Sequence, residues 1–143
     1  MSYITWSDSL SVGNTFIDRD HRRLVELVNE LHDAMTAGRG KEVVGKTLAA
    51  LIQYTAEHFK REEDEMARIN YGQSLTHKQE HKKLVTHVLE LQKKFADGKT
   101  MLTVEVSKFL KEWLVNHIMK TDQDLAAAIK ASRATIASNN LPS

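Results

Sequence analysis

The sequence predicts an all-α fold, namely an antiparallel up-down-up-down four-helix bundle with an N-terminal arm and a short C-terminal helix. Three observations predict this fold. The only proline of the 143-residue chain is Pro142 in the tail, so no proline interrupts a helix in the body. Apolar residues recur at alternating spacings of three and four along four segments, as in amphipathic helices. Short turns join these segments, and helices joined by short turns pack as antiparallel neighbours.

The first helix follows an N-terminal arm. Residues 1–17 show no helical periodicity, and we expect them to form an ordered arm. Asp18 is the expected N-cap of a helix over about 18–37, because a short acidic side chain accepts hydrogen bonds from the first free backbone N–H groups. Gly38 and Gly40 are expected to end that helix.

The remaining helices belong to the same domain, which we expect to span residues 1–143. Helices are expected over about 41–69, 74–97 and 104–119, which completes a bundle over about 18–119. The C-terminal helix is expected over about 121–132, followed by a frayed tail to residue 143. The expected N-caps are Ser74, Thr103 and Thr121.

Polar side chains stand on the apolar stripes of all four bundle helices. Five histidines and one glutamate continue the helical period of these stripes: His21, His58, Glu62, His77, His81 and His117. They lie alternately early and late in successive helices, so an antiparallel bundle brings them to one end. Buried groups of this kind need a partner, and six of them in one place need a shared one. The two other histidines, His32 and His87, are expected on the flank and the outer face.

Asp122 is a seventh candidate. It follows His117 by five residues, which is about 140° around a continuous α-helix, so the two side chains would face different ways. We therefore expect the helix to break or turn near residues 119–121. With Thr121 as the cap of the next segment, the Asp122 carboxylate would turn back toward the histidines.

These donors predict a pair of metal ions. The chain has no cysteine, which excludes thiolate zinc sites and iron–sulfur clusters. Five imidazoles and two carboxylates exceed the four ligands of one zinc and suit first-row ions such as iron. Two irons bridged by Glu62 and Asp122 fit the count, with the nitrogens divided three and two. No histidine has the E-x-x-H spacing of carboxylate-rich di-iron bundles, which favours dioxygen binding over oxidation.

Composition excludes other classes of function. The net charge of +1 provides no field that would attract nucleic acid or anionic lipid. No apolar run is long enough to span a membrane, so we expect no membrane partner. Residues 1–6 do not resemble a secretory signal, and a cytoplasmic location is the default expectation. A protein partner is expected only if the chain is the excised sensor domain of a longer protein.

Several short motifs point to one known family. They are SVGN at 11–14, IDRDH at 17–21, HFKREE at 58–63, HKQEH at 77–81 and WLVNHI at 113–118, together with Trp6, Met66, Tyr71 and Asp122. In this combination the chain resembles bacterial hemerythrins over essentially its whole length. Two positions depart from the family's usual residues. Asp20 stands where glutamine is frequent and Leu84 where phenylalanine is frequent, and both changes bear on oxygen access and autoxidation.

The resemblance implies a specific di-iron centre. It implies that His77, His81 and His117 hold one iron and that His21 and His58 hold the other. It also implies that Glu62, Asp122 and an oxo or hydroxo group bridge the two irons. Dioxygen, the implied ligand, would bind at the two-histidine iron in a pocket formed by Leu24, Phe59, Trp113, Leu114 and Ile118.

The expected function is reversible dioxygen binding at this non-haem centre, for transport, storage or delivery. We expect no catalytic residue and no enzyme. Two alternatives remain open from the sequence: an oxygen- or redox-sensing module of a signalling protein, and a di-iron peroxidase or oxidase. The second would use the coordination position that the three-and-two division of the nitrogens leaves open on one iron.

Overall fold

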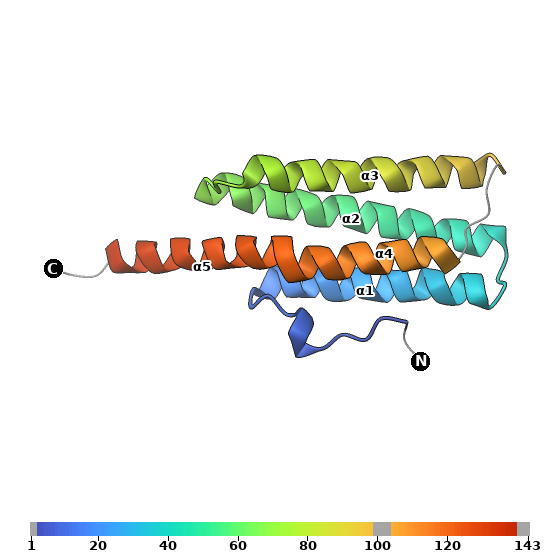
Figure 1. Cartoon of the computed structure of the whole chain (residues 1–143), viewed down its shortest axis with the longest axis horizontal. Helices are drawn as coiled ribbons and strands as arrows, with labels where there is room; N and C mark the ends of the chain where they lie inside the picture. Colours follow the sequence, from blue (N-terminus) through green and yellow to red (C-terminus); the bar gives the residue numbers. More distant parts are fainter. Residues whose placement is uncertain (1–2, 99–103, 140–143) are drawn as a thin grey trace.

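Apart from the N-terminal arm and the turns between helices, the part of the chain that the structure describes is helical. The computed structural model describes residues 3–98 and 104–139, without the side chains of residues 104–105, 118–119 and 134–139. Its elements in order are the 3-10 turn η1 (Asp8–Leu10), α1 (Thr15–Thr36), α2 (Lys41–Ile69), α3 (Ser74–Ala96), α4 (Val104–Asn116), the π-helical turn η2 (His117–Thr121) and α5 (Asp122–Asn139). Figure 1 shows that α1 to α4 run in alternating directions and that α5 continues the direction of α4. The predicted antiparallel helical bundle is confirmed.

Helix α1 begins three residues earlier than predicted. Its N-cap is Asn14, whose side-chain oxygen accepts a hydrogen bond from the backbone N–H of Ile17 at 3.2 Å. Asp18 is therefore not the cap. Its carboxylate instead accepts hydrogen bonds from the Ser11 hydroxyl at 2.6 Å and from the backbone N–H of Val12 at 2.8 Å. Asp18 thus ties the arm to the helix.

The N-terminal arm is held along α1, as Figure 1 shows. The amide of Asn29 on α1 pairs with the backbone of Ile4, accepting from its N–H at 2.7 Å and donating to its carbonyl at 2.8 Å. The Tyr3 ring stacks on the ring of His32 with centroids 3.8 Å apart. His32 is half-buried by these contacts, consistent with its expected place on the flank of the stripe.

Of the predicted break or turn between α4 and α5, the structure has the turn, and the helix does not break. The backbone N–H of Asp122 donates to the carbonyl of His117, five residues earlier, so one wider π-helical turn joins the two helices. Thr121 is not an N-cap, because its hydroxyl donates to Glu80 Oε2 at 2.9 Å. Helix α5 also continues to Asn139 rather than ending near residue 132, and it extends beyond the bundle in Figure 1.

The other two predicted caps have different outcomes. Gln73 precedes α3, and Ser74 is the first residue of that helix rather than its N-cap. Thr103 lies outside the described residues.

Two apolar clusters lie on either side of the polar positions. On α1, Leu24 belongs to the larger cluster and Ile17 to the smaller one, and His21 lies between them. On α2, Phe59 and Met66 bracket Glu62 in the same way. Each fully buried side chain of this size contributes about 1.5–3 kcal/mol through removal from water. The clusters therefore enclose a buried polar layer between them.

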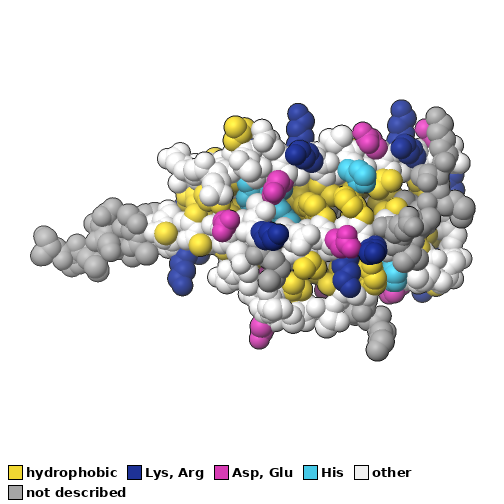
Figure 2. All heavy atoms as spheres, in the orientation of Figure 1, with side chains coloured by type: hydrophobic (Ala, Val, Ile, Leu, Met, Phe, Trp, Pro, Cys, Tyr) yellow, Lys and Arg dark blue, Asp and Glu magenta, His cyan; other side chains and the backbone are white. Residues whose placement is uncertain are grey.

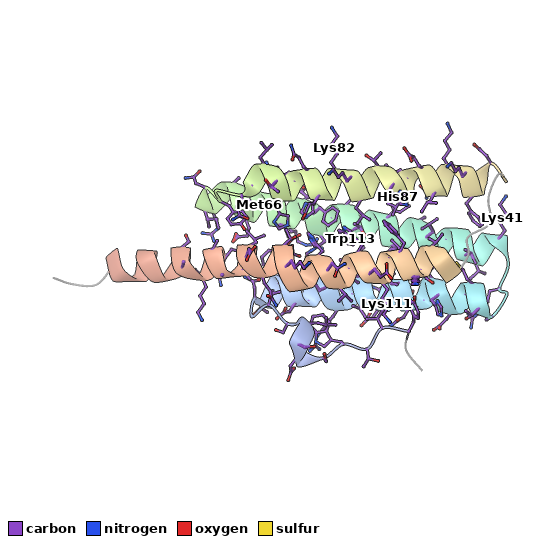
Figure 3. All side chains as sticks on the ribbon, viewed as in Figure 1. Lys41, Met66, Lys82, His87, Lys111 and Trp113 are labelled. Carbon is purple, nitrogen blue, oxygen red and sulfur yellow. The ribbon has the colours of Figure 1, made fainter. Side chains whose placement is uncertain are left out.

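Side chains in Figure 3 show the same division of inside and outside. Met66 and Trp113 lie between the helices, whereas Lys82 points away from the bundle. Among the helices of the described residues, none is long and apolar enough to cross a membrane.

Candidate metal centre

Seven predicted side chains meet in one layer of the bundle. They come from five elements and are at most 4% exposed: His21 from α1, His58 and Glu62 from α2, His77 and His81 from α3, His117 from η2 and Asp122 from α5. Helical spacing explains six of them, because each continues an apolar stripe that faces the core. The structure brings all seven together.

The π-helical turn explains how Asp122 joins the layer. In a continuous α-helix, the five-residue spacing would turn the Asp122 side chain about 140° away from that of His117. In the wider turn, His117 Nε2 lies 2.7 Å from Asp122 Oδ1. The five-residue spacing therefore serves one site without a break in the helix.

The donor atoms form two groups that share both carboxylates. Three histidines, His77, His81 and His117, form one group with Glu62 and Asp122. Two histidines, His21 and His58, form the other group with the same two carboxylates. Within each group the ligand atoms lie within 4.8 Å of one another. A carboxylate has two oxygens, so a shared one can bridge two neighbouring ions.

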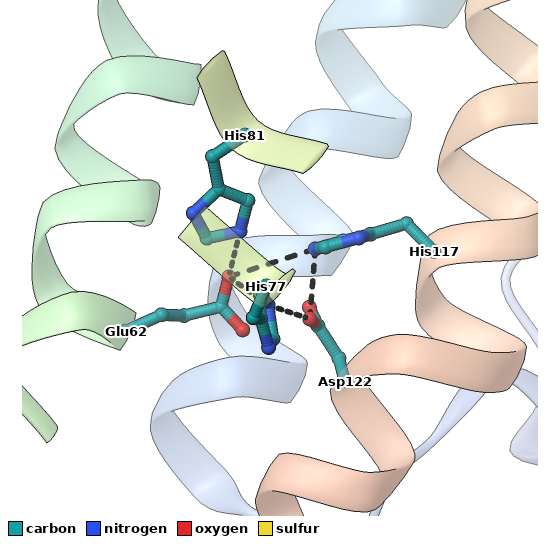
Figure 4. A group of neighbouring side chains, drawn as sticks. All are labelled: Glu62, His77, His81, His117 and Asp122. Atoms are coloured by element: carbon teal, nitrogen blue, oxygen red, sulfur yellow. Dashed lines mark ion pairs between the residues drawn. The ribbon is translucent and has the colours of Figure 1, made fainter. Parts of the chain in front are cut away.

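Distances show how the carboxylates are shared. Figure 4 shows the three-histidine group, with the imidazoles turned toward the carboxylates. Asp122 Oδ1 lies 3.0 Å from His77 Nε2, and Asp122 Oδ2 lies 2.5 Å from His21 Nε2. Glu62 Oε1 lies 3.0 Å from His58 Nε2 and 3.3 Å from His81 Nε2. Each carboxylate thus reaches both groups.

Unpartnered polar atoms test whether this layer fits metal ions. More than nine in ten buried polar groups in proteins have a hydrogen-bond partner. Here nine buried side-chain nitrogen and oxygen atoms within the described residues make no hydrogen bond, and all nine belong to the seven side chains above. They include the Nε2 atoms of His58, His77, His81 and His117, both Glu62 oxygens and Asp122 Oδ1. Nitrogen and hard oxygen donors left unpaired in one place fit first-row metal ions.

Comparisons with known proteins agree with this geometry. The family described as "Hemerythrin HHE cation binding domain" matches residues 12–129. The chain belongs to the hemerythrin family. It is 41% identical over 124 residues to the bacteriohemerythrin of Methylococcus capsulatus, covering 86% of this chain and 94% of the relative. It is 34% identical over 131 residues to the bacteriohemerythrin of Stenotrophomonas maltophilia, covering 92% and 84%.

A solved structure of wild-type hemerythrin is also similar. It superposes with a TM-score of 0.86 at 37% identity, covering 90% of this chain and 98% of that one. The resemblance that the sequence motifs indicated is thereby confirmed, and so is the helical fold that it implied.

Charges in this hemerythrin-family layer are balanced between carboxylates and imidazoles. Burial and the Asp122 carboxylate raise the pKa of Glu62, but the neighbouring His58 and His117 outweigh them and lower it to about 2. Burial lowers the pKa of His117, yet Asp122 and Glu62 raise it to about 9. The neighbouring carboxylates also raise the pKa of His58, so protons on His58 and His117 compensate the carboxylates where bound cations would otherwise do so.

Outer nitrogens of three histidines face carboxylates that sequence reasoning did not assign. His58 Nδ1 donates to Asp20 at 2.9 Å, and His81 Nδ1 lies 3.3 Å from Glu63 Oε2. His117 Nδ1 lies 4.0 Å from Glu80 Oε2. A ligating histidine usually donates its second N–H to such a group, which fixes the ring and its tautomer. This general rule predicts that acidic partners exist for the ligating histidines. The spacing of residues along a helix does not identify which acids they are.

Aromatic rings cover the apolar side of the layer. The Phe59 ring stacks on His81 with centroids 3.6 Å apart, and the Trp113 ring stacks on His117 at 4.8 Å. Leu24, Trp113 and Leu114, three of the five residues assigned to a dioxygen pocket, line a small apolar cavity of about 20 Å³. Phe59 packs against the histidines instead of lining that cavity. The side chain of Ile118, the fifth, lies outside the described residues.

A surface groove of about 500 Å³ lies between α3 and the α4–η2 segment. Figure 2 shows hydrophobic side chains and histidine gathered along this face. Leu84, Trp113 and His117 are among the residues that line the groove. His117 therefore lies between the polar layer and the surface groove.

Proposed function

We propose that the chain binds dioxygen reversibly at a non-haem, carboxylate-bridged di-iron centre and serves as an oxygen carrier, storage or delivery protein. The observation that carries this proposal is the pair of donor groups, three histidines and two histidines, that share Glu62 and Asp122. The relatives named bacteriohemerythrin and the similar hemerythrin structure support it.

Each donor group would hold one ion. His77, His81 and His117 would hold one iron, His21 and His58 the other, and Glu62 and Asp122 both. Two irons held together supply the electrons that reversible binding of dioxygen requires. We assign dioxygen to the two-histidine side, because that group has one imidazole fewer.

Apolar side chains around the layer keep water out. Leu24, Phe59 and Leu114 are 2–3% exposed, and they cover the layer from the side of the larger cluster. Exclusion of water and protons lets dioxygen leave unchanged. The five imidazoles also donate less negative charge than carboxylates would, which disfavours the high oxidation states needed for substrate oxidation.

We propose further that the chain is a binding protein and not a peroxidase or oxidase. The iron-loaded chain should turn over a reductant with peroxide or dioxygen no faster than free iron does. Steady turnover well above that rate, lost in a variant that binds no iron, would assign the enzyme alternative.

Metal content and the optical spectrum test the proposed function. The purified chain should contain two irons, and its ferrous form should gain a visible absorption band in air. That band should disappear when oxygen is removed and return when oxygen is readmitted. Immediate and irreversible oxidation of the ferrous form would contradict reversible binding while leaving the metal site intact.

A further inference from the structure

Asp20 is a buried charge that belongs to neither donor group. Its side chain is 0–1% exposed, and it lies on α1 next to His21. A buried carboxylate is costly unless it is paired and hydrogen-bonded. Burial raises the pKa of Asp20, but hydrogen bonds from His58 and Arg61 lower it well below its usual range, so the carboxylate is ionised.

Three side chains of α2 donate four hydrogen bonds to this carboxylate. Asp20 Oδ2 accepts from His58 Nδ1 at 2.9 Å and from Arg61 Nε at 2.8 Å. Asp20 Oδ1 accepts from the Tyr54 hydroxyl at 2.9 Å and from Arg61 Nη2 at 3.0 Å. Arg61 therefore grips both oxygens, which is the strong bidentate form of this pairing.

The other four histidines of the layer have weaker outer partners or none. The carboxylate near His81 Nδ1 is Glu63, which is 34% exposed, and the one near His117 Nδ1 is Glu80, which is 47% exposed. His21 Nδ1 and His77 Nδ1 have no hydrogen-bond partner among the described residues. Water screens an exposed charge far more than a buried one. Asp20 therefore acts on the centre more strongly than Glu63 or Glu80.

We propose that Asp20 is a positioning residue that fixes the His58 ring and, through it, lowers the reduction potential of the two-histidine iron, while Arg61 weakens this effect. The inference rests on the proposed di-iron function. A carboxylate that accepts the outer N–H of a ligating imidazole orients the ring and makes its other nitrogen a better donor. Better donation favours ferric over ferrous iron. Arg61 draws the same negative charge toward itself, so its removal leaves more of that charge on His58.

A simple tie between helices is the alternative. Asp20 on α1 and Arg61 on α2 would then stabilise the bundle without influencing the metal. That alternative predicts that loss of either partner lowers stability in the same direction and leaves the potential unchanged. The proposal predicts potential shifts of opposite sign, which a tie between helices does not produce.

The test measures the midpoint potential of the iron-loaded full chain by anaerobic optical titration. Asp20→Asn keeps an oxygen that can accept from His58 but removes the charge, and should raise the potential. Arg61→Gln removes the opposing charge at a side chain that is 36% exposed, and should lower it. At the wild-type midpoint, the two variants should change the ferric-to-ferrous ratio in opposite directions. The double variant should return toward the wild type.

Two control variants separate charge from hydrogen bonding. Asp64→Asn removes an exposed carboxylate of α2 and should leave the potential unchanged, because water screens that charge. Tyr54→Phe removes one hydrogen bond to Asp20 without changing any charge, and should shift the potential less than either charge variant.

Shifts of the same sign, or none, in Asp20→Asn and Arg61→Gln would overturn the inference. If Asp20→Asn does not retain two irons, the midpoint potential of Arg61→Gln tests the inference. A lowered potential supports the inference, and an unchanged or raised potential refutes it. A wild-type chain that binds no iron contradicts the proposed function itself. If the wild-type chain binds two irons but the midpoint potentials of the two variants do not shift in opposite directions, only the role of Asp20 and Arg61 is contradicted.

Discussion

At the scale of single residues, His81 and His87 lie on the same helix and have different surroundings. His81 is 3% exposed, its ring stacks on Phe59, and its two nitrogens face Glu62 and Glu63. His87 is exposed and packs beside Phe109. Helical spacing predicts this difference from the sequence, because six residues turn the helix by about 240°. Spacing could not identify the acids that face the outer nitrogens, since those contacts depend on neighbouring helices.

The substitution His81→Ala should therefore remove most of one iron. It leaves only His77 and His117 as imidazole donors of the three-histidine group. Iron analysis of the purified variant should give close to one iron per chain. His87→Ala is the matched control on the same helix and should keep two. Full retention of two irons after His81→Ala would refute the assignment of His81 as a ligand.

At the scale of elements, local geometry explains two of the differences between prediction and structure. Asn14 and Asp18 are equally good N-cap residues by type, and the choice depends on where the arm lies, since Ser11 and Val12 occupy the Asp18 carboxylate. The five-residue spacing of His117 and Asp122 predicts a break only if the helix is α throughout. A π-helical turn satisfies the spacing without one, and such turns often occur at functional sites.

Insertion of one alanine between Lys120 and Thr121 should disrupt the centre. The extra residue rotates Asp122 by about 100° away from His117, so a shared carboxylate leaves the layer. Iron content should fall sharply while helical circular dichroism stays near the wild-type level. The control is the same insertion after Lys130, an exposed position of α5 beyond the site, and it should keep both irons. Equal iron content in the two insertion variants would show that the π-helical turn does not position a ligand.

At the scale of the whole molecule, the polar layer couples stability to pH and to metal. In the metal-free protein the pKa of His117 is raised from 6.5 to about 9, because Asp122 and Glu62 outweigh burial. The stability from its protonated form is fully present below 6.5 and is lost as pH rises through about 9. The pKa of Glu62 is lowered from 4.5 to about 2, so its contribution is present above 4.5 and is lost as pH falls through about 2.

Iron binding should therefore stabilise the protein more as pH rises. Metal ligation requires neutral imidazoles, so protons compete with iron at low pH. Between pH 6.5 and about 9, the metal-free form should lose thermal stability while the iron-loaded form should not. Thermal unfolding of both forms, followed by circular dichroism, should show a melting-temperature difference that widens with pH. A difference that stays constant over this range would contradict the coupling.

Oxygen uptake by the ferrous protein tests the central claim most directly. Dioxygen should be taken up in a ratio of one molecule to two irons, and all of it should be released when the gas phase is replaced by argon. The same sample should repeat the cycle with its visible band restored each time. Uptake without release, or release of peroxide in place of dioxygen, would contradict reversible binding at the paired centre.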